Sequence, residues 1–502
     1  MSPRKAGQVK AVPDRAPQPG PTLAPVRRIR PPGQRLYDMP YSAVAPRMVN
    51  PDLGLHNLVA RAGHNAAYEI DVTLLDAPDH RLIRSGVLLA HRVIDGRGEW
   101  YLTAPDWQPL LPKDRIELMG HADLPEELAD LIRPLRRRAP LGPVAALRCD
   151  RREFALRDDA GTTVALLRDD KVTVRRGGLT TARYREVMLT PVGPGLSEDQ
   201  TGWLDRALLG AGSTLVERFP RLVTRLGAPA TGPSDIPAVT TLQPDSPFRV
   251  FVGQLLGLRL RQIIEADLGV RGGDPAAVDR LVDQARLLLA ELRGVAVAAA
   301  PAGDWLEDLG DELAWLLAEP AAGRPADQVP SRLRSERYLA LLDALVTAAR
   351  GPRLAEPGTQ SAVEVVGALV EAVVQRLAGA VERVPAGSPE LAAWAEVREV
   401  VALVDATTAL AGHVLPDRAA KLTARLAKPR RLLTRVQTSG VSAQQELTRA
   451  AGLTAEQAFA AGRAYERQDA DTRRAHAAAV RAWTKACTKL AQQRPVRPGE
   501  QP

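Results

Sequence analysis

Cations at helical spacing are the residues of this chain whose pattern most directly predicts a chemistry. Between residues 418 and 435 a Lys or Arg recurs at every third or fourth position, at Arg418, Lys421, Arg425, Lys428, Arg431 and Arg435. On an α-helix this spacing places the side chains along one face. Such a row can hold phosphate groups or another polyanion. It is equally typical of a solvated helix face, or of one paired with acidic helices, so both interpretations stay open.

Other common chemistries lack a matching pattern in the sequence. The histidines are scattered and do not have the spacing of zinc ligands. Cys149 and Cys487 are the two cysteines, and their separation favours reduced thiols over a disulfide framework. We find neither a phosphate-binding Gly-rich loop nor a Ser nucleophile elbow.

The elements that must position these residues change character along the chain. From 51 to 225 apolar residues alternate with polar ones, as in half-buried strands, with short helices expected at 125–137 and 197–210. The charged stretch 168–171 is predicted to be a hairpin turn between two short strands. Mostly antiparallel strands of this kind suit a closed sheet or barrel.

After residue 245 the apolar period becomes that of helices. Gly and Pro interrupt the pattern, which predicts an all-helical bundle over 246–492. The Pro- and Gly-rich residues 226–245 are expected to form a linker, and residues 1–50 and 493–502 disordered tails. The tail at 1–50 is rich in Pro and Arg.

The formal net charge of +8 is unevenly distributed. Residues 1–47 hold nine Lys or Arg and two Asp, whereas residues 246–417 hold 16 basic and 24 acidic side chains, a net −8. The first part of the helical half should therefore repel a polyanion. No apolar run reaches membrane-spanning length and the N-terminus lacks an apolar signal region, so we expect a cytoplasmic protein without a membrane partner.

Three stretches of the N-terminal half resemble the CYTH family, also called triphosphate tunnel metalloenzymes. They are the D-x-P-D-x-R-L turn at 76–82, the Gly-started apolar strand at 85–89 and the Trp-bearing strand at 98–102. The resemblance implies a β-tunnel in which Lys, Arg and Glu hold a triphosphate and its metal ions. Arg92, Arg148 and Arg151 are then the candidate phosphate ligands.

Several tunnel positions depart from the CYTH pattern. The Glu-x-Glu-x-Lys strand is missing before residue 68, and Thr103 stands where the family has Lys. Glu186 matches the first acid of a later pair, but Met188 replaces the second. Glu186 is thus a weak candidate metal ligand, and two Mg²⁺ or Mn²⁺ ions would have too few carboxylate oxygens. The resemblance therefore implies a tunnel that has lost its catalytic residues.

The helical half resembles the CHAD family, which often follows CYTH and binds inorganic polyphosphate. The matching text lies at 274–288, 334–343 and 458–467. Family members carry a His/Arg run after the Asp-Pro of the first stretch, and here Asp279 and Val282 replace its His and first Arg. Arg286 matches that run and Arg398 matches a second one, so both are candidate phosphate ligands.

Together these observations predict an α+β protein, with an antiparallel β-tunnel domain followed by an all-α helical bundle. We expect a non-catalytic CYTH–CHAD-like protein with residual phosphate or polyphosphate binding and no cofactor. One alternative is a protein-interaction scaffold that uses the acidic helical surface to bind a protein partner. Another is a metal-dependent triphosphatase or cyclase using shifted residues such as Arg92, Arg148, Glu186 and Glu69, with Mg²⁺ or Mn²⁺ only in that case. Nucleic acid is expected as a partner only through the basic tail.

Overall fold

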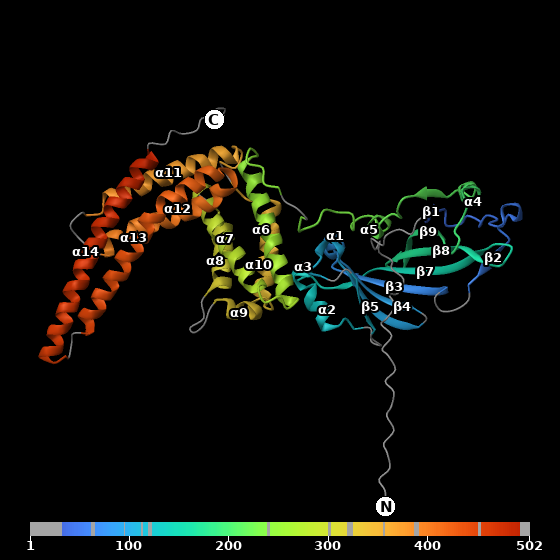
Figure 1. The fold of residues 1–502 in the computed structure, drawn as a ribbon, viewed down its shortest axis with the longest axis horizontal. Helices are drawn as coiled ribbons and strands as arrows, with labels where there is room; N and C mark the ends of the chain where they lie inside the picture. The colour runs from blue at the N-terminus through green and yellow to red at the C-terminus, as the bar shows by residue number, and fades with distance from the viewer. Residues whose placement is uncertain are drawn as a thin grey trace, which may run out of the picture. The chain divides into compact units, whose positions relative to one another are not determined.

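The chain folds into two compact units, each described here by itself. The computed structural model describes residues 33–61, 66–94, 96–111, 114–118, 123–237, 241–299, 303–318, 325–354, 357–385, 391–449 and 453–491. One unit comprises residues 1–125 and 139–233 and carries the sheet; the other comprises residues 126–138 and 234–502 and is helical (Figure 1). The predicted class and order, antiparallel sheet first and helical bundle second, are confirmed. Residues 1–32 and 493–502 of the expected tails lie outside the described residues.

The sheet is built of antiparallel strands in the order β10-β1-β9-β8-β7-β3-β4-β5-β6, and β2 also pairs with β7. The long central strands β7, β8 and β9 form most of its surface (Figure 1). The strands are β1 (Arg35–Met39), β2 (Asn57–Ala60), β3 (Ala67–Asp76), β4 (Leu88–Ile94), β5 (Arg97–Thr103), β6 (Asp114–Leu118), β7 (Gly142–Arg157), β8 (Thr163–Arg176), β9 (Leu179–Pro191) and β10 (Thr214–Val216).

The expected hairpin turn at 168–171 is wrong, because these residues lie in the middle of β8. Asp169 pairs with Arg185 of β9 and Asp170 with Arg151 of β7, so neighbouring strands neutralise the charges that resembled a turn. The turn lies instead at Gly177 and Gly178, both with positive φ. Two such residues form the tight loop that matches the twist of paired strands.

Strand β1 lies inside the range expected to be a disordered tail, and that expectation is wrong for residues 35–39. Leu36 pairs with Met188 and Asp38 with Glu186, so β1 extends the sheet beside β9. Tyr37 is fully buried on the opposite face from Asp38. Five residues, of which Leu36, Tyr37 and Met39 are buried, are too short a signal to stand out beside a Pro- and Arg-rich stretch.

Short helices cover both faces of this part of the sheet. Helix α4 (Glu198–Gly210) begins with a capping box, in which Ser197 and Gln200 each bond the other's backbone N–H, and it confirms the helix expected at 197–210. Its Leu204 and Leu208 pack with Tyr37 in one cluster. Helix α5 (Leu222–Leu226) packs against the opposite face.

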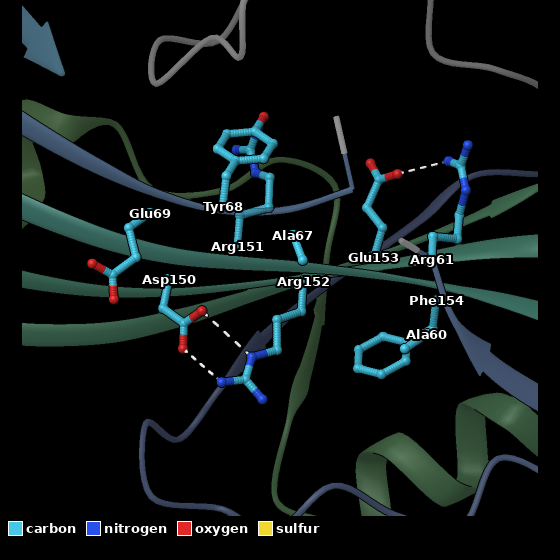
Figure 2. A pocket seen from close by; sticks show the side chains of 10 residues that line it. All are labelled: Ala60, Arg61, Ala67, Tyr68, Glu69, Asp150, Arg151, Arg152, Glu153 and Phe154. Atoms are coloured by element: carbon cyan, nitrogen blue, oxygen red, sulfur yellow. Dashed lines mark hydrogen bonds and ion pairs between the residues drawn. The ribbon is translucent and has the colours of Figure 1, made fainter. Parts of the chain in front are cut away.

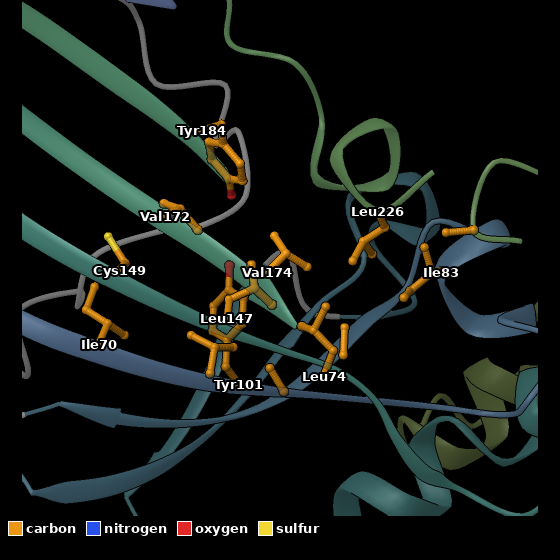
Figure 3. Close-up of a cluster of buried hydrophobic side chains, with 14 residues drawn as sticks. Ile70, Leu74, Ile83, Tyr101, Leu147, Cys149, Val172, Val174, Tyr184 and Leu226 are labelled. Carbon is orange, nitrogen blue, oxygen red and sulfur yellow. The ribbon is translucent and has the colours of Figure 1, made fainter. Parts of the chain in front are cut away.

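We call the face that α5 covers the inner face; it carries Ile70, Leu147, Cys149, Val172 and Tyr184. These side chains form one buried apolar cluster with Leu226 and Ala230 of the segment that includes α5. Figure 3 shows Leu226 reaching the side chains of the strands. The inner face is therefore filled by aliphatic and aromatic groups over much of its length.

Arginines fasten the backbone of this covering segment. Arg176 of β8 donates to the carbonyls of Leu226, at 2.7 Å, and Ala228, at 2.9 Å. Arg84 donates to the carbonyl of Pro229 at 2.9 Å. Part of the stretch expected to be a linker is thus packed on the sheet, because its carbonyls have cationic donors and its apolar side chains a core to enter. Arg84 is the last residue of the short helix α1 (Arg81–Arg84).

The helical unit follows the predicted period of 3.6. Its helices are α2 (Glu126–Leu131), α3 (Arg133–Arg136), α6 (Phe248–Arg271), α7 (Ala277–Ala298), α8 (Trp305–Leu317), α9 (Pro325–Arg332), α10 (Glu336–Arg350), α11 (Ala362–Glu382), α12 (Ala395–Val414), α13 (Pro416–Arg449) and α14 (Ala455–Ala491). Helices α13 and α14 run side by side as a long hairpin (Figure 1). In the described part of the chain, every helix is too short or too polar for a bilayer crossing.

Candidate functional site

The inner face ends in a group of charged residues that are paired with one another. Arg151 forms a two-pronged ion pair with Asp170 on the next strand, with both N–O distances at 2.7 Å. Its third nitrogen, Nη1, donates to the Tyr68 hydroxyl at 3.0 Å, and Arg168 Nε lies 3.2 Å from Asp170. Arg151 is 3% exposed. The candidate phosphate ligand Arg151 therefore lies on the inner face, but its guanidinium is occupied.

Arg92 is held in a similar way at the other side of the inner face. It lies opposite Val72 on β3 and Glu99 on β5, and it forms an ion pair with Glu99. Its guanidinium stacks over the Tyr101 ring at 4.0 Å from the centroid. At 1% exposure, Arg92 is among the largest buried side chains of the chain. A phosphate group would have to displace Glu99 to reach it.

Glu186 lies at the centre of a third charged group. Asp38 and Asp170 are its direct cross-strand neighbours. Arg225 of α5 lies 2.9 Å from Asp38 and 3.6 Å from Glu186. Arg225 also covers the Tyr184 ring, 4.4 Å from its centroid. Burial raises the pKa of Glu186 to about 7; Arg225 lowers it, while Asp170 and Asp38 raise it further.

These carboxylates do not fit a pair of catalytic metal ions. Asp170 accepts from Arg151 through both oxygens, and Asp38 accepts from Arg225. Hard divalent cations need several carboxylate oxygens free to coordinate. Across the ranges that the structure describes, no three His, Cys, Asp or Glu side chains converge as a metal site would require. The weak metal candidate Glu186 thus has acidic neighbours, but their oxygens already bind arginine.

Arg148 lies on the opposite face of the sheet. Its side chain is 61% exposed and pairs with Glu69 on β3. Figure 2 shows Arg151 and Arg152 pointing to opposite sides of β7, as alternation along a strand requires. Arg148 and Arg151 are an odd number of positions apart, so they cannot share a face of this strand. The shifted catalytic set that includes Arg148 and Glu69 is therefore not assembled with Arg92 and Glu186.

The two CHAD-like candidates are exposed on different helices of the bundle. Arg286 on α7 is 57% exposed and lies 3.8 Å from Asp283 on the same helix. Arg398 is exposed on α12. The bundle also holds a buried charged cluster. Its Arg259 donates to Glu291 at 2.8 Å, and His413 Nε2 is 2.7 Å from the same carboxylate. That group is internally neutralised as well.

The α13–α14 hairpin presents a different arrangement. We call the basic stripe the side chains of Lys421, Arg425, Lys428, Arg431 and Arg435; all but the half-buried Arg425 are exposed. None of the five forms an ion pair with another residue that the structure describes. Arg418 and Arg430 lie outside the stripe, since they pair with Glu371 and Asp405.

Helix α14 adds cations that the sequence alone did not connect with the stripe. Arg481, Lys485 and Lys489 are exposed at four-residue intervals, and Arg425 Nη1 donates to the Lys489 carbonyl at 3.1 Å. The two rows of cations therefore adjoin at this point. A signal was available in the sequence, because residues 418–445 hold seven Lys or Arg and residues 472–491 hold five, with no Asp or Glu in either stretch.

Comparison with known proteins gives distant likenesses. No family model matches the chain. Two uncharacterized proteins of Mycobacterium tuberculosis, from strains CDC 1551 and H37Rv, are each 26% identical to it over 365 residues, which is 62% of this chain and 68% of theirs.

Solved structures that align with the chain cover a smaller part of it. A Bacillus halodurans protein described as a candidate adenylate cyclase is 14% identical, covering 33% of this chain and 93% of its own, with a TM-score of 0.20. A Hippeastrum protein, described as a candidate adenylyl cyclase with a dominant triphosphatase activity, is 13% identical over 39% of this chain and 98% of its own, with the same TM-score. Scores this low carry no argument about activity.

Proposed function

We propose that this chain is a non-catalytic protein that binds polyanions, inorganic polyphosphate first among them, on the basic stripe and the adjoining cations of α14. The observation that carries the proposal is the acid-free composition of residues 418–445 and 472–491, which together hold 12 Lys or Arg. A long anion that meets a row of unpaired cations releases counterions and binds electrostatically. The resemblance to CHAD proteins in the sequence agrees with this ligand class.

Access distinguishes the stripe from the inner face. A phosphate at Arg151 would leave Asp170 as a buried carboxylate without its main partner, and breaking a buried pair costs about 3–5 kcal/mol. A phosphate at Lys428 or Arg431 breaks no ion pair that the structure describes. The stripe is therefore the surface on which a polyanion gains attraction without such a cost.

The length of the stripe suits a chain-like anion rather than a single phosphate. From Lys421 to Arg435 the helix rises by roughly 21 Å at 1.5 Å per residue. Five cations over that length contact several phosphates at once, whereas a lone orthophosphate meets one or two. We therefore expect affinity to grow with the length of the polyphosphate.

The experiment is a binding titration with long-chain polyphosphate. The triple variant Lys428→Glu, Arg431→Glu, Arg435→Glu is compared with a matched variant of equal charge change, Arg280→Glu, Arg286→Glu, Arg398→Glu, at exposed positions of α7 and α12. We expect the first variant to lose roughly tenfold or more in affinity at about 50 mM salt and the second to lose less than about threefold. Equal losses in both would mean that net charge alone controls binding, and no loss in the first would refute the proposal.

The same titration measures how much the N-terminal tail contributes to binding. A deletion of residues 1–32 removes basic residues of the tail but retains β1. A small loss of affinity in this deletion is expected, since it removes seven Lys or Arg that lie far from the stripe in sequence. Loss of all binding there would place the interaction in the tail and contradict the stripe.

A further inference from the structure

We propose that His476 is a pH-sensitive latch that holds α14 against the rest of the helical unit and weakens when its ring gains a second proton. His476 is 2% exposed, in the middle of α14. Trp394 Nε1 lies 3.0 Å from His476 Nδ1, and the Pro385 carbonyl lies 3.0 Å from Nε2. One imidazole thus joins three separate segments of the unit.

The two partners permit one protonation state of the ring. An indole N–H is a donor only and a carbonyl is an acceptor only. Nδ1 must therefore be bare to accept from Trp394, and Nε2 must carry the proton that it donates to Pro385. The neutral ring satisfies both contacts, and the Trp394 and His476 rings meet edge to face, with centroids 5.5 Å apart.

A second proton would break this arrangement. It would set an Nδ1–H against the Trp394 N–H, so two donors would face each other in a site without water access. A buried charge also needs a carboxylate partner, and His476 has no ion pair within the described parts of the chain. The protonated ring is therefore accommodated by opening the contact.

Among the described residues, no charged side chain of the surrounding elements forms an ion pair with His476. On α14 itself Arg473 and Arg474 pair with Asp469 and Asp471. Arg383, just after α11, pairs with Glu396 of α12. The pKa of the Cys487 thiol, further along α14, is raised by burial and by the charge of Glu382. On α13, Arg435 of the stripe is exposed. None of these offers a carboxylate to His476.

The latch matters because the core positions next to His476 on α14 are small, and the next large buried side chain, Trp483, lies two turns further along. Ala475 and Ala479 are buried on the same helix, and alanine side chains contribute little apolar area. Trp394 is fully buried at the end of the short helix η3 (Leu391–Trp394), next to α12. Opening the latch should therefore loosen α14, while the cores of α6 and α7 stay protected. Histidine is the side chain whose charge most commonly changes between pH 5 and 8, so a comparison across that interval tests the latch.

The test is amide hydrogen exchange of the full chain at pH 7.5 and 5.5, corrected for the intrinsic rate at each pH. We expect residues 472–491 of wild type to lose at least about fivefold in protection on acidification, relative to α6. In His476→Asn, whose oxygen can accept from Trp394 but cannot titrate, that ratio should fall to about one. Trp394→Phe removes the opposing N–H. In this variant the acid-induced loss of protection in residues 472–491, relative to α6, should be less than about half of the wild-type loss.

A matched control separates this latch from the half-buried His413 of the same unit. His413 Nε2 lies 2.7 Å from a Glu291 oxygen, so this ring has the carboxylate neighbour that His476 lacks. His413→Asn should keep the wild-type acid loss in residues 472–491. An equal acid loss in wild type and Trp394→Phe would overturn the latch, even if His476→Asn failed to fold. Because the readout needs no polyphosphate, its failure is distinct from failure of the proposed function.

Discussion

The ion pairs of the inner-face arginines limit their ability to bind a phosphate. Arg92, Arg151 and Arg225 each contact a carboxylate from a different element, and two of them stack on a tyrosine within 4.4 Å. A guanidinium held in two directions has little freedom to rearrange around a new anion. Arg92 and Arg151, which the CYTH resemblance suggested as phosphate ligands, therefore serve to hold neighbouring strands of the sheet together.

Glu186 should make the sheet unit less stable as pH rises. Its pKa is raised by burial from 4.5 to about 7, so its protonated form stabilises the fold fully below pH 4.5, and that contribution is lost as pH rises through 7. Glu186→Gln cannot ionise and should be more stable than wild type at pH 8, by up to about 3 kcal/mol, with little difference at pH 5. Urea unfolding at both pH values measures this; a less stable variant at pH 8 would show that the charged form is needed.

Arg151 should matter for stability far more than its neighbour in sequence. Arg151→Leu leaves Asp170 buried without its two-pronged partner, which should cost about 3–5 kcal/mol. Arg152→Leu, at a 65% exposed side chain, should cost less than about 1 kcal/mol. Denaturant titrations of the two variants give the comparison, and equal losses would mean that the Arg151–Asp170 pair is not buried in solution.

Of the three arginines that the CYTH resemblance implied as phosphate ligands, two lie on the inner face and Arg148 does not. Arg92 and Arg151 were predicted candidates and both lie on that face. Their partners were not predictable, because Asp170 lies on another strand whose register is set by the whole sheet. Alternation alone could have excluded Arg148, which is three positions from Arg151.

Elements with strong periodicity were predictable, and short ones were not. The helices of the second unit follow apolar spacing over many turns, so their existence follows from the sequence. β1 and α5 have five residues each and depend on the sheet for burial. β8 was mistaken for two strands because its central charges are satisfied across the sheet, which a local pattern cannot show.

Helix α5 should be an integral part of the sheet core. Leu226→Ala removes a side chain buried among Leu74, Val174 and Ile83, so we expect a loss of about 2–4 kcal/mol in the free energy of unfolding. The control is Leu209→Ala on α4, at a 45% exposed position, with an expected loss below about 1 kcal/mol. If Leu226→Ala were as mild as its control, the inner face would be open in solution and available to a ligand.

For the molecule as a whole the order of the two units followed from the switch in apolar period, but their limits did not. Residues 126–138 belong to the helical unit although they interrupt the strands in sequence. Arg271 of α6 binds Asp130 at 2.6 Å, and Arg137 binds Asp235 and Asp343. Contacts across more than 90 residues of sequence cannot be read from a local pattern.

The stretch expected to be a linker should resist proteolysis over much of its length. Leu226 and Ala230 are buried in the sheet unit, while Asp235 and Ile236 are buried in the helical unit. Proteinase K, followed by mass spectrometry, should therefore give little early cleavage within residues 226–231 or at 235–236. Early cleavage there would show that the arginine contacts to this backbone are not maintained.

The paired inner face should not support catalysis. With Mg²⁺ or Mn²⁺ the protein should hydrolyse tripolyphosphate far more slowly than about 1 s⁻¹, the low end for ordinary enzymes. Phosphate release measured for wild type and Glu186→Ala should be equally low. Faster turnover that disappears in Glu186→Ala would restore the triphosphatase alternative.

Lysine footprinting tests the central claim most directly, because Lys421, Lys428, Lys485 and Lys489 all lie on the α13–α14 hairpin, whereas Lys171 lies on β8. Acylation of the full chain is measured by mass spectrometry with and without long-chain polyphosphate at low salt. We expect polyphosphate to slow modification of the hairpin lysines severalfold and to leave Lys171 unchanged. Protection of Lys171 with unchanged hairpin lysines would place the ligand on the sheet and contradict the account.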